Sequence, residues 1–132
     1  MKVNFRYIRN IPHEVFGYDD VTVKINLVCD PVEYGAYYPK SKIIELNVLD
    51  ENDRILDTDL IIKILCHELA HHIQFLNYTP VCGKEHDEKF NNLLWQLLGM
   101  YYEGNIPEHV RKQVLIDQEV SSHDEGVELL YG

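Results

Sequence analysis

Apolar residues recur at helical spacing in three stretches of the second half of the chain. The densest pattern lies between Asp57 and Asn77 and predicts a helix with little solvent-facing surface. A second helix is predicted from residue 84 or 85 to Tyr102, because its apolar positions keep a spacing of about 3.6 residues. From Pro107 to about Val120, a weaker pattern of the same kind predicts a third helix.

The first half of the chain instead alternates apolar and polar residues over short stretches, which is typical of half-buried strands. These stretches are residues 21–28, 34–38 and 42–48. Turn signals at Asp30-Pro31 and at Pro39 to Lys42 separate them. Because the connections are short, we predict a small, mainly antiparallel three-stranded sheet.

The N-terminal residues give a weaker signal. Residues 3–8 alternate loosely and predict a short strand or an irregular lead-in, and residues 11–16 start a helical turn. Together with the helices, the strands predict an α+β fold in which the sheet packs on a central helix at 57–77 and on a second helix.

The composition agrees with one soluble globular domain, because 45% of the residues are hydrophobic and 26% are charged. A chain of 132 residues is long enough for a single hydrophobic core. No stretch reaches the apolar length of a membrane span, and the N-terminus lacks the apolar region of a signal peptide. Three cysteines do not make a disulfide framework, so we expect reduced thiols and a cytoplasmic location.

The net charge of −10 limits the partners. A chain that binds nucleic acid needs a basic face to neutralise phosphates, and the sequence gives no sign of one. Direct DNA or RNA binding is therefore not expected. From Asp117 to Gly132 there is no Lys or Arg, and we interpret residues 121–132 as an acidic, mobile tail.

Candidate chemistry lies in the central helix, in the motif His67-Glu68-Leu69-Ala70-His71. The two histidines are four residues apart, so they project from one face of the helix and can bind one metal ion. Zn²⁺ suits imidazole nitrogens best, and Glu68 is placed to take a proton from a water that the metal acidifies. Without a metal, the same pattern would be a buried helix with two packed histidines.

A catalytic zinc site needs a third protein ligand from elsewhere in the chain. His86 is the preferred candidate, because it opens the next helix and Phe90, four residues later, can pack that helix in the core. Glu85 and Glu88 are rivals, since carboxylate oxygens also bind zinc.

Four stretches carry a family resemblance: Gly35–Tyr38, Ile43–Asn47, His67–His72 and His86–Phe90. With these motifs the chain resembles the SprT-like zinc metallopeptidases, the family of the bacterial SprT proteins and of the catalytic domain of Spartan. The resemblance covers about Tyr34 to Leu98. Asp87 stands where the family usually has glycine, and no stretch resembles the zinc ribbon or basic extension of many relatives.

The resemblance implies a single zincin-like metallopeptidase domain over residues 1–132. It implies that His67, His71 and His86 bind Zn²⁺ and that Glu68 is the catalytic base. The substrate would be a protein or peptide, and an extended peptide could pair with an outer strand. We place Gly35, Ala36, Tyr37 and Tyr38 on that strand. The alternative is an ordinary strand whose aromatic residues pack on the core, because it would have the same sequence pattern.

Further points stay open from the sequence. The tyrosines that could steady an oxyanion are Tyr37, Tyr38, Tyr101 and Tyr131. His72 points away from the metal side of its helix and is interpreted as packed or as supporting a ligand. Two other functions compete: an ImmA/IrrE-like metallopeptidase in which a glutamate such as Glu85 is the third ligand, and a non-catalytic binding module that contains zinc.

Overall fold

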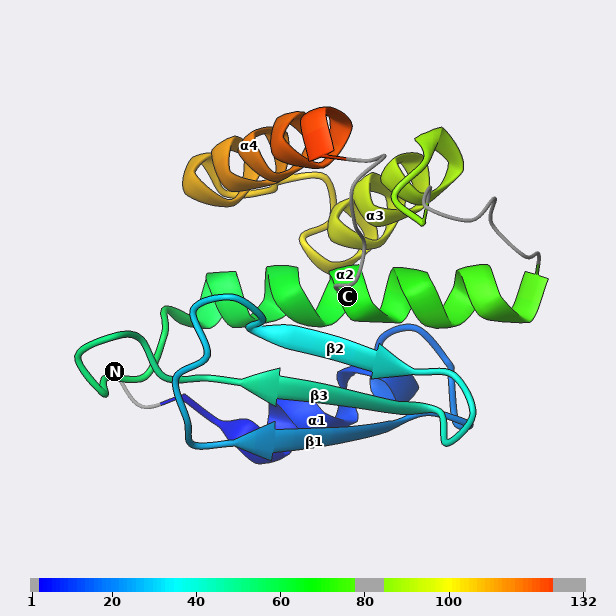
Figure 1. Ribbon diagram of the computed structural model, residues 1–132. Coiled ribbons are helices and arrows are strands. Elements are labelled where there is room, and N and C mark those ends of the chain that lie inside the picture. The colour runs from blue at the N-terminus through cyan, green and yellow to red at the C-terminus, as the bar shows by residue number, and fades with distance from the viewer. Residues whose placement is uncertain (1–2, 78–84, 125–132) are drawn as a thin grey trace.

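In the computed structural model, which describes residues 3–77 and 85–124, the long helix α2 (Thr58–Asn77) lies between a small sheet and two further helices (Figure 1). The sheet packs on one side of α2, and α3 and α4 lie on its other side (Figure 1). The remaining elements are α1 (Phe5–Glu14), β1 (Thr22–Asn26), β2 (Gly35–Tyr38), β3 (Ile43–Asn47), α3 (Glu88–Tyr101) and α4 (Glu108–Asp124). This is the α+β fold that the sequence predicts.

The sheet is mixed, so the prediction of a mainly antiparallel sheet was wrong. Its strand order is β1-β3-β2. The turn after Tyr38 makes β2 and β3 antiparallel, and its Lys42 N–H donates to the Tyr38 carbonyl at 2.7 Å. β1 pairs with β3 in parallel instead of pairing with β2, because residues 27–34 form a longer loop that leaves room for β3 between them. β2 is therefore an edge strand.

Alternation along the strands separates an inner from an outer face of the sheet. Val23, Ile44 and Tyr37 share one rung of the ladder, and the first two are buried in the core. The outer face carries polar pairs such as Lys24 and Glu45, whose Nζ and Oε2 atoms are 3.7 Å apart. The inner residues of β2 therefore face α2, so they are the strand residues that contact the helix with the metal motif.

Residues 5–14 form a helix, not the strand or irregular lead-in predicted for residues 3–8. Asn4 caps it, because its side chain accepts a hydrogen bond from the Tyr7 backbone N–H at 3.0 Å. Ile8 and Ile11 are buried on one side of this helix, which packs against β1. Their three-residue spacing is helical, so packing against the core stabilises a helix here and not a strand.

The three later helices occur where the apolar patterns predict them, with shifted ends. α3 begins at Glu88, later than predicted, because the Asp87 side chain caps it by accepting from the Phe90 backbone N–H at 2.8 Å. α4 continues to Asp124, so residues 121–124 are helical and not tail. The rest of the predicted tail, residues 125–132, lies outside the described residues. Within the described residues, no helix is both long and apolar enough to span a membrane.

Candidate metal centre

Three histidines from two separate parts of the chain meet between α2 and the start of α3. Ligand nitrogens of His67, His71 and His86 all lie within 4.8 Å of one another. The two Nε2 atoms of His71 and His86 are 3.1 Å apart. His67 and His71 project from the same side of α2, as their spacing predicts, and His86 lies two residues before α3 begins. The group is positioned to hold a metal ion.

Phe90 holds these rings together from the α3 side. Its side chain is buried, and its ring centroid lies 4.8 Å from His67, 4.4 Å from His71 and 5.0 Å from His86. Asp87 fixes the helix start between His86 and Phe90 by capping it. Asp87 therefore has a defined structural role here.

The donor set fits a transition metal such as zinc. Zn²⁺ binds imidazole nitrogens at about 2.0–2.1 Å in tetrahedral geometry, which places two nitrogens about 3.3 Å apart. The distance of 3.1 Å between His71 and His86 is close to that value. Glu85 and Glu88, the rival third ligands, are not part of the group that the described residues form here.

Glu68 adds a second observation in favour of an ion. Only 2% of its surface is exposed, and its Oε1 atom has no hydrogen-bond partner among the described residues. Burial raises the pKa of this carboxyl well above its ordinary value; the charge of Glu33 raises it further, and Lys63 opposes the rise. An unsatisfied buried carboxylate is costly, and a metal with its coordinated water would relieve that cost.

The edge strand β2 lies directly against Glu68. A Cβ atom built on Gly35 would be 2.9 Å from Glu68 Oε2 and 2.5 Å from Ile64 Cγ2. Both distances are shorter than real contacts allow, so glycine is required for this close approach. One residue further, Ala36 is buried, and Tyr38 at the end of the strand is exposed.

Tyr37 does not face the open edge of β2. Its hydroxyl lies 2.6 Å from Nδ1 of His72, and the other nitrogen of that ring, Nε2, is 2.9 Å from Asp20 Oδ1. Burial raises the pKa of Tyr37 to about 12, with a further contribution from the charge of Asp20. His72 is fully buried and joins α2 to β2 and to the loop before β1, which agrees with its interpretation as a packed residue.

The other tyrosines considered from the sequence have different surroundings. Tyr38 donates from its hydroxyl to Glu45 Oε1 at 3.3 Å, on the outer face of the sheet. The hydroxyl of Tyr101 lies 2.8 Å from that of Tyr7 in α1. Tyr131 lies outside the described residues.

One residue of the centre was missed from the sequence. Gln74 in α2 is only 3% exposed, and its Oε1 atom is 3.0 Å from His71 Nδ1. Its Nε2 donates to the carbonyl of Glu85 at 2.8 Å. The signal that could have indicated it is an amide three residues after the second histidine of the motif, between the apolar residues Ile73 and Phe75.

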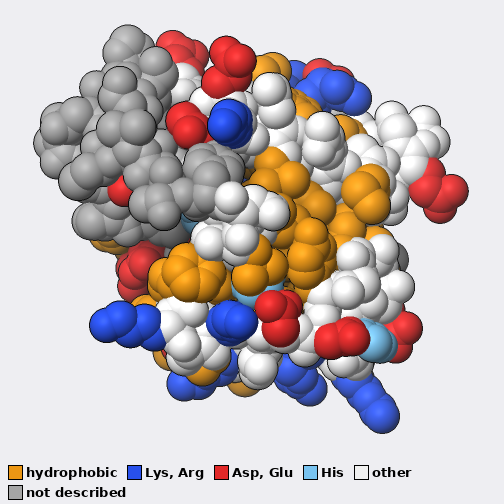
Figure 2. Space-filling view, turned by 90° about the vertical axis from the view of Figure 1, so that its right-hand side faces the viewer, with side chains coloured by type: hydrophobic (Ala, Val, Ile, Leu, Met, Phe, Trp, Pro, Cys, Tyr) orange, Lys and Arg blue, Asp and Glu red, His pale blue; other side chains and the backbone are white. Residues whose placement is uncertain are grey.

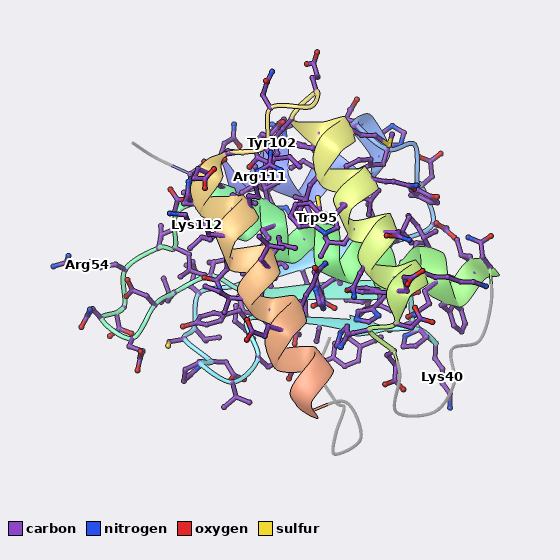
Figure 3. The ribbon with its side chains drawn as sticks, turned by 90° about the horizontal axis from the view of Figure 1, so that it is seen from above. Lys40, Arg54, Trp95, Tyr102, Arg111 and Lys112 are labelled. Atoms are coloured by element: carbon purple, nitrogen blue, oxygen red, sulfur yellow. The ribbon has the colours of Figure 1, made fainter. Side chains whose placement is uncertain are left out.

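A second group that could hold an ion lies at the surface, at the start of α2. It consists of Asp57, Asp59 and His109. His109 Nε2 is 3.0 Å from Asp57 Oδ2 and 3.5 Å from Asp59 Oδ2, so both carboxylates already contact the imidazole ring. Tyr102, labelled in Figure 3 near the start of α4, donates to Asp59 Oδ1 at 2.6 Å.

No family model, no curated protein and no solved structure matches the chain. We therefore infer the function from the residues of the metal centre and from their geometry.

Proposed function

We propose that this protein is a zinc-dependent metalloendopeptidase of the SprT-like kind, which hydrolyses peptide bonds in protein or peptide substrates. The observation that carries the proposal is the pairing of a three-histidine group with the buried, partly unsatisfied carboxylate of Glu68. Three protein ligands are typical of catalytic zinc sites, whereas structural sites usually have four.

His67, His71 and His86 would hold the zinc ion. When bound in such a site, zinc polarises a carbonyl group and lowers the pKa of a coordinated water towards about 7. Glu68 is the group that can take the proton, because it directly follows His67 in the motif and its buried carboxylate has an oxygen without a hydrogen-bond partner among the described residues. It can then return that proton to the leaving amine.

The edge strand β2 supports a position for the substrate. Among the described residues, β2 is hydrogen-bonded to a strand on one side only, β3, and it lies against the helix that carries the metal motif. An extended peptide could add to this edge by backbone pairing. Gly35, Ala36, Tyr37 and Tyr38 would then contribute their backbone rather than the Tyr37 hydroxyl, which contacts His72.

The surface charge favours proteins over nucleic acids as partners. The chain carries a net charge of −10. On the face that Figure 2 shows, Lys and Arg side chains are interspersed with Asp and Glu around a central apolar patch. Phosphate binding needs a concentrated basic surface, so we do not propose direct nucleic-acid binding. A cytoplasmic location remains our expectation.

The test is a comparison of the wild type with Glu68→Gln, both loaded with Zn²⁺ and incubated with a broad library of peptides. We expect the variant to keep its zinc and to lose at least 10²-fold in cleavage rate, the lower end of what a general base contributes. Glu88→Gln, which changes an exposed glutamate of the same region, is the matched control and should cleave normally. Wild-type protein that binds zinc and cleaves no peptide faster than Glu68→Gln would favour the non-catalytic binding module.

Measuring the zinc bound by two further variants separates our proposal from an ImmA/IrrE-like enzyme. His86→Ala should lose zinc affinity and Glu85→Ala should retain it, because the three-ligand group contains His86. The reverse result would assign the third ligand to Glu85.

A further inference from the structure

Gln74 contacts both halves of the metal centre at once. It lies in α2, three residues after His71, and its amide is buried. The oxygen end of this amide meets His71 Nδ1 at 3.0 Å, and its nitrogen end meets the backbone carbonyl of Glu85 at 2.8 Å. Glu85 directly precedes His86, so one side chain joins two ligands that come from different parts of the chain.

Hydrogen-bond chemistry fixes which way the amide points. The Glu85 carbonyl can only accept a hydrogen bond, so the NH₂ group of Gln74 must face it. The oxygen of Gln74 therefore faces His71, and this oxygen can only accept as well. His71 must then carry its proton on Nδ1, which leaves the lone pair of Nε2 directed towards His86, 3.1 Å away.

We infer that Gln74 is a positioning residue of the metal centre. It selects the tautomer of His71 that can bind a metal through Nε2, and it holds the backbone beside His86 at the correct distance from α2. The inference rests on the metal-binding part of the proposed function. It does not depend on which substrate is cleaved or on whether the bound metal is catalytic.

Burial makes the arrangement specific. An amide that is 3% exposed cannot exchange these partners for bulk water, so loss of the hydrogen bonds to His71 and Glu85 would not be compensated by hydration. Groups that orient metal ligands in this way typically change metal affinity by about 10–100-fold when they are removed. The two contacts thus explain why a polar side chain occupies this buried position of α2.

The test measures zinc affinity by competition with a chromophoric chelator, on apo protein prepared from the full chain. Gln74→Met keeps the length of the side chain and removes its hydrogen bonds to His71 and Glu85, so we expect an affinity loss of about 10–100-fold. Gln74→Glu keeps an acceptor for His71 and loses the donor to Glu85, so its loss should be smaller. Asn77→Met is the matched control, because that amide donates to the Ile73 carbonyl of the same helix, and its affinity should match the wild type.

A second measurement separates positioning from general packing. In the His86→Ala background the link through Glu85 no longer serves a ligand, so Gln74→Met should cost less affinity there than in the wild type. An equal cost in both backgrounds, or wild-type affinity in both Gln74 variants, would overturn the inference. Should Gln74→Met fail to fold, Gln74→Glu decides the outcome by its own affinity. A wild-type protein without measurable zinc affinity would instead reject the proposed function itself.

Discussion

Replacing Gly35 by alanine would place a methyl group between β2 and the side chain of Glu68. The new Cβ would lie 2.5 Å from Ile64 Cγ2, 2.9 Å from Glu68 Oε2 and 3.1 Å from Glu68 Cγ. Ordinary contacts at such a position are 3.4–4 Å. The neighbouring side chains, or the strand itself, must therefore move by about 1 Å to remove the overlap.

This displacement should have two measurable effects. Overpacking of a well-packed interior costs about 1–3 kcal/mol, which for a chain of this size lowers the melting temperature by roughly 3–5 °C for each kcal/mol. A misplacement of about 1 Å in a reacting group can cost about 10²-fold in rate, so peptide cleavage should fall by about that factor. Zinc affinity should change little, because the overlap involves Glu68 and not the three histidines.

The matched control is Gly99→Ala, in the interior of α3. A Cβ atom there would meet nothing within 4 Å, and alanine is the better helix former by about 0.5–1 kcal/mol. Gly99→Ala should therefore be slightly more stable than the wild type and should cleave normally. Both variants would be compared by urea unfolding and by cleavage of a peptide library. The reasoning is refuted if Gly35→Ala unfolds and cleaves like the wild type.

Other predictions follow from single contacts. Tyr37→Phe removes the hydroxyl that contacts His72 and should cost about 1 kcal/mol at neutral pH, measured by urea unfolding. Because the folded pKa of Tyr37 is raised to about 12 from 10.0, the native state keeps a proton that the unfolded state loses, so wild-type stability should fall as pH rises from 10 towards 12. Tyr37→Phe should lack that part of the fall, and equal slopes for both proteins would contradict the assignment. Lys63→Met breaks the ion pair that joins α2 to Asp117 of α4 and should lower the free energy of unfolding by about 1–2 kcal/mol, with Lys40→Met as an exposed control. Removing zinc with a chelator should lower the melting temperature, since an ion present at 100 times its Kd stabilises the fold by about 2.7 kcal/mol, and His71→Ala should abolish this response.

The helices and the metal motif could be predicted because their signals are local. The apolar period of α2 predicted its length, and the four-residue spacing of His67 and His71 placed both rings on one side of that helix. The strands were also visible as alternating stretches. The pairing of the strands could not be predicted, because alternation shows which residues share a face of the sheet and not which strand lies beside which. The parallel pairing of β1 with β3 depends on the path of the loop formed by residues 27–34.

The third histidine of the group shows the limit of a prediction made from residue spacing. His86 was preferred over Glu85 and Glu88 because Phe90 follows it at helical spacing. In the structure, however, His86 precedes the helix, and its position depends on the Asp87 cap and on the Gln74 hydrogen bond to the Glu85 carbonyl. Both contacts join residues that a period of 3.6 cannot relate. A ligand outside a regular element is set by tertiary contacts, so its geometry could not follow from the pattern.

The match between β2 and α2 explains why two short motifs far apart in the sequence serve one site. Two residues of a strand advance about 6.6 Å, and four residues of a helix advance about 6.0 Å. Gly35 and Tyr37 can therefore contact Glu68 and His72 in turn, as the Gly35 distances and the Tyr37 hydrogen bond require. Ala36, the residue between them, alternates to the other face of the sheet, so β2 approaches the helix through one residue without a side chain and one with a large aromatic ring. Gly35 leaves room for the Glu68 carboxylate, and the Tyr37 hydrogen bond fixes the strand along the helix.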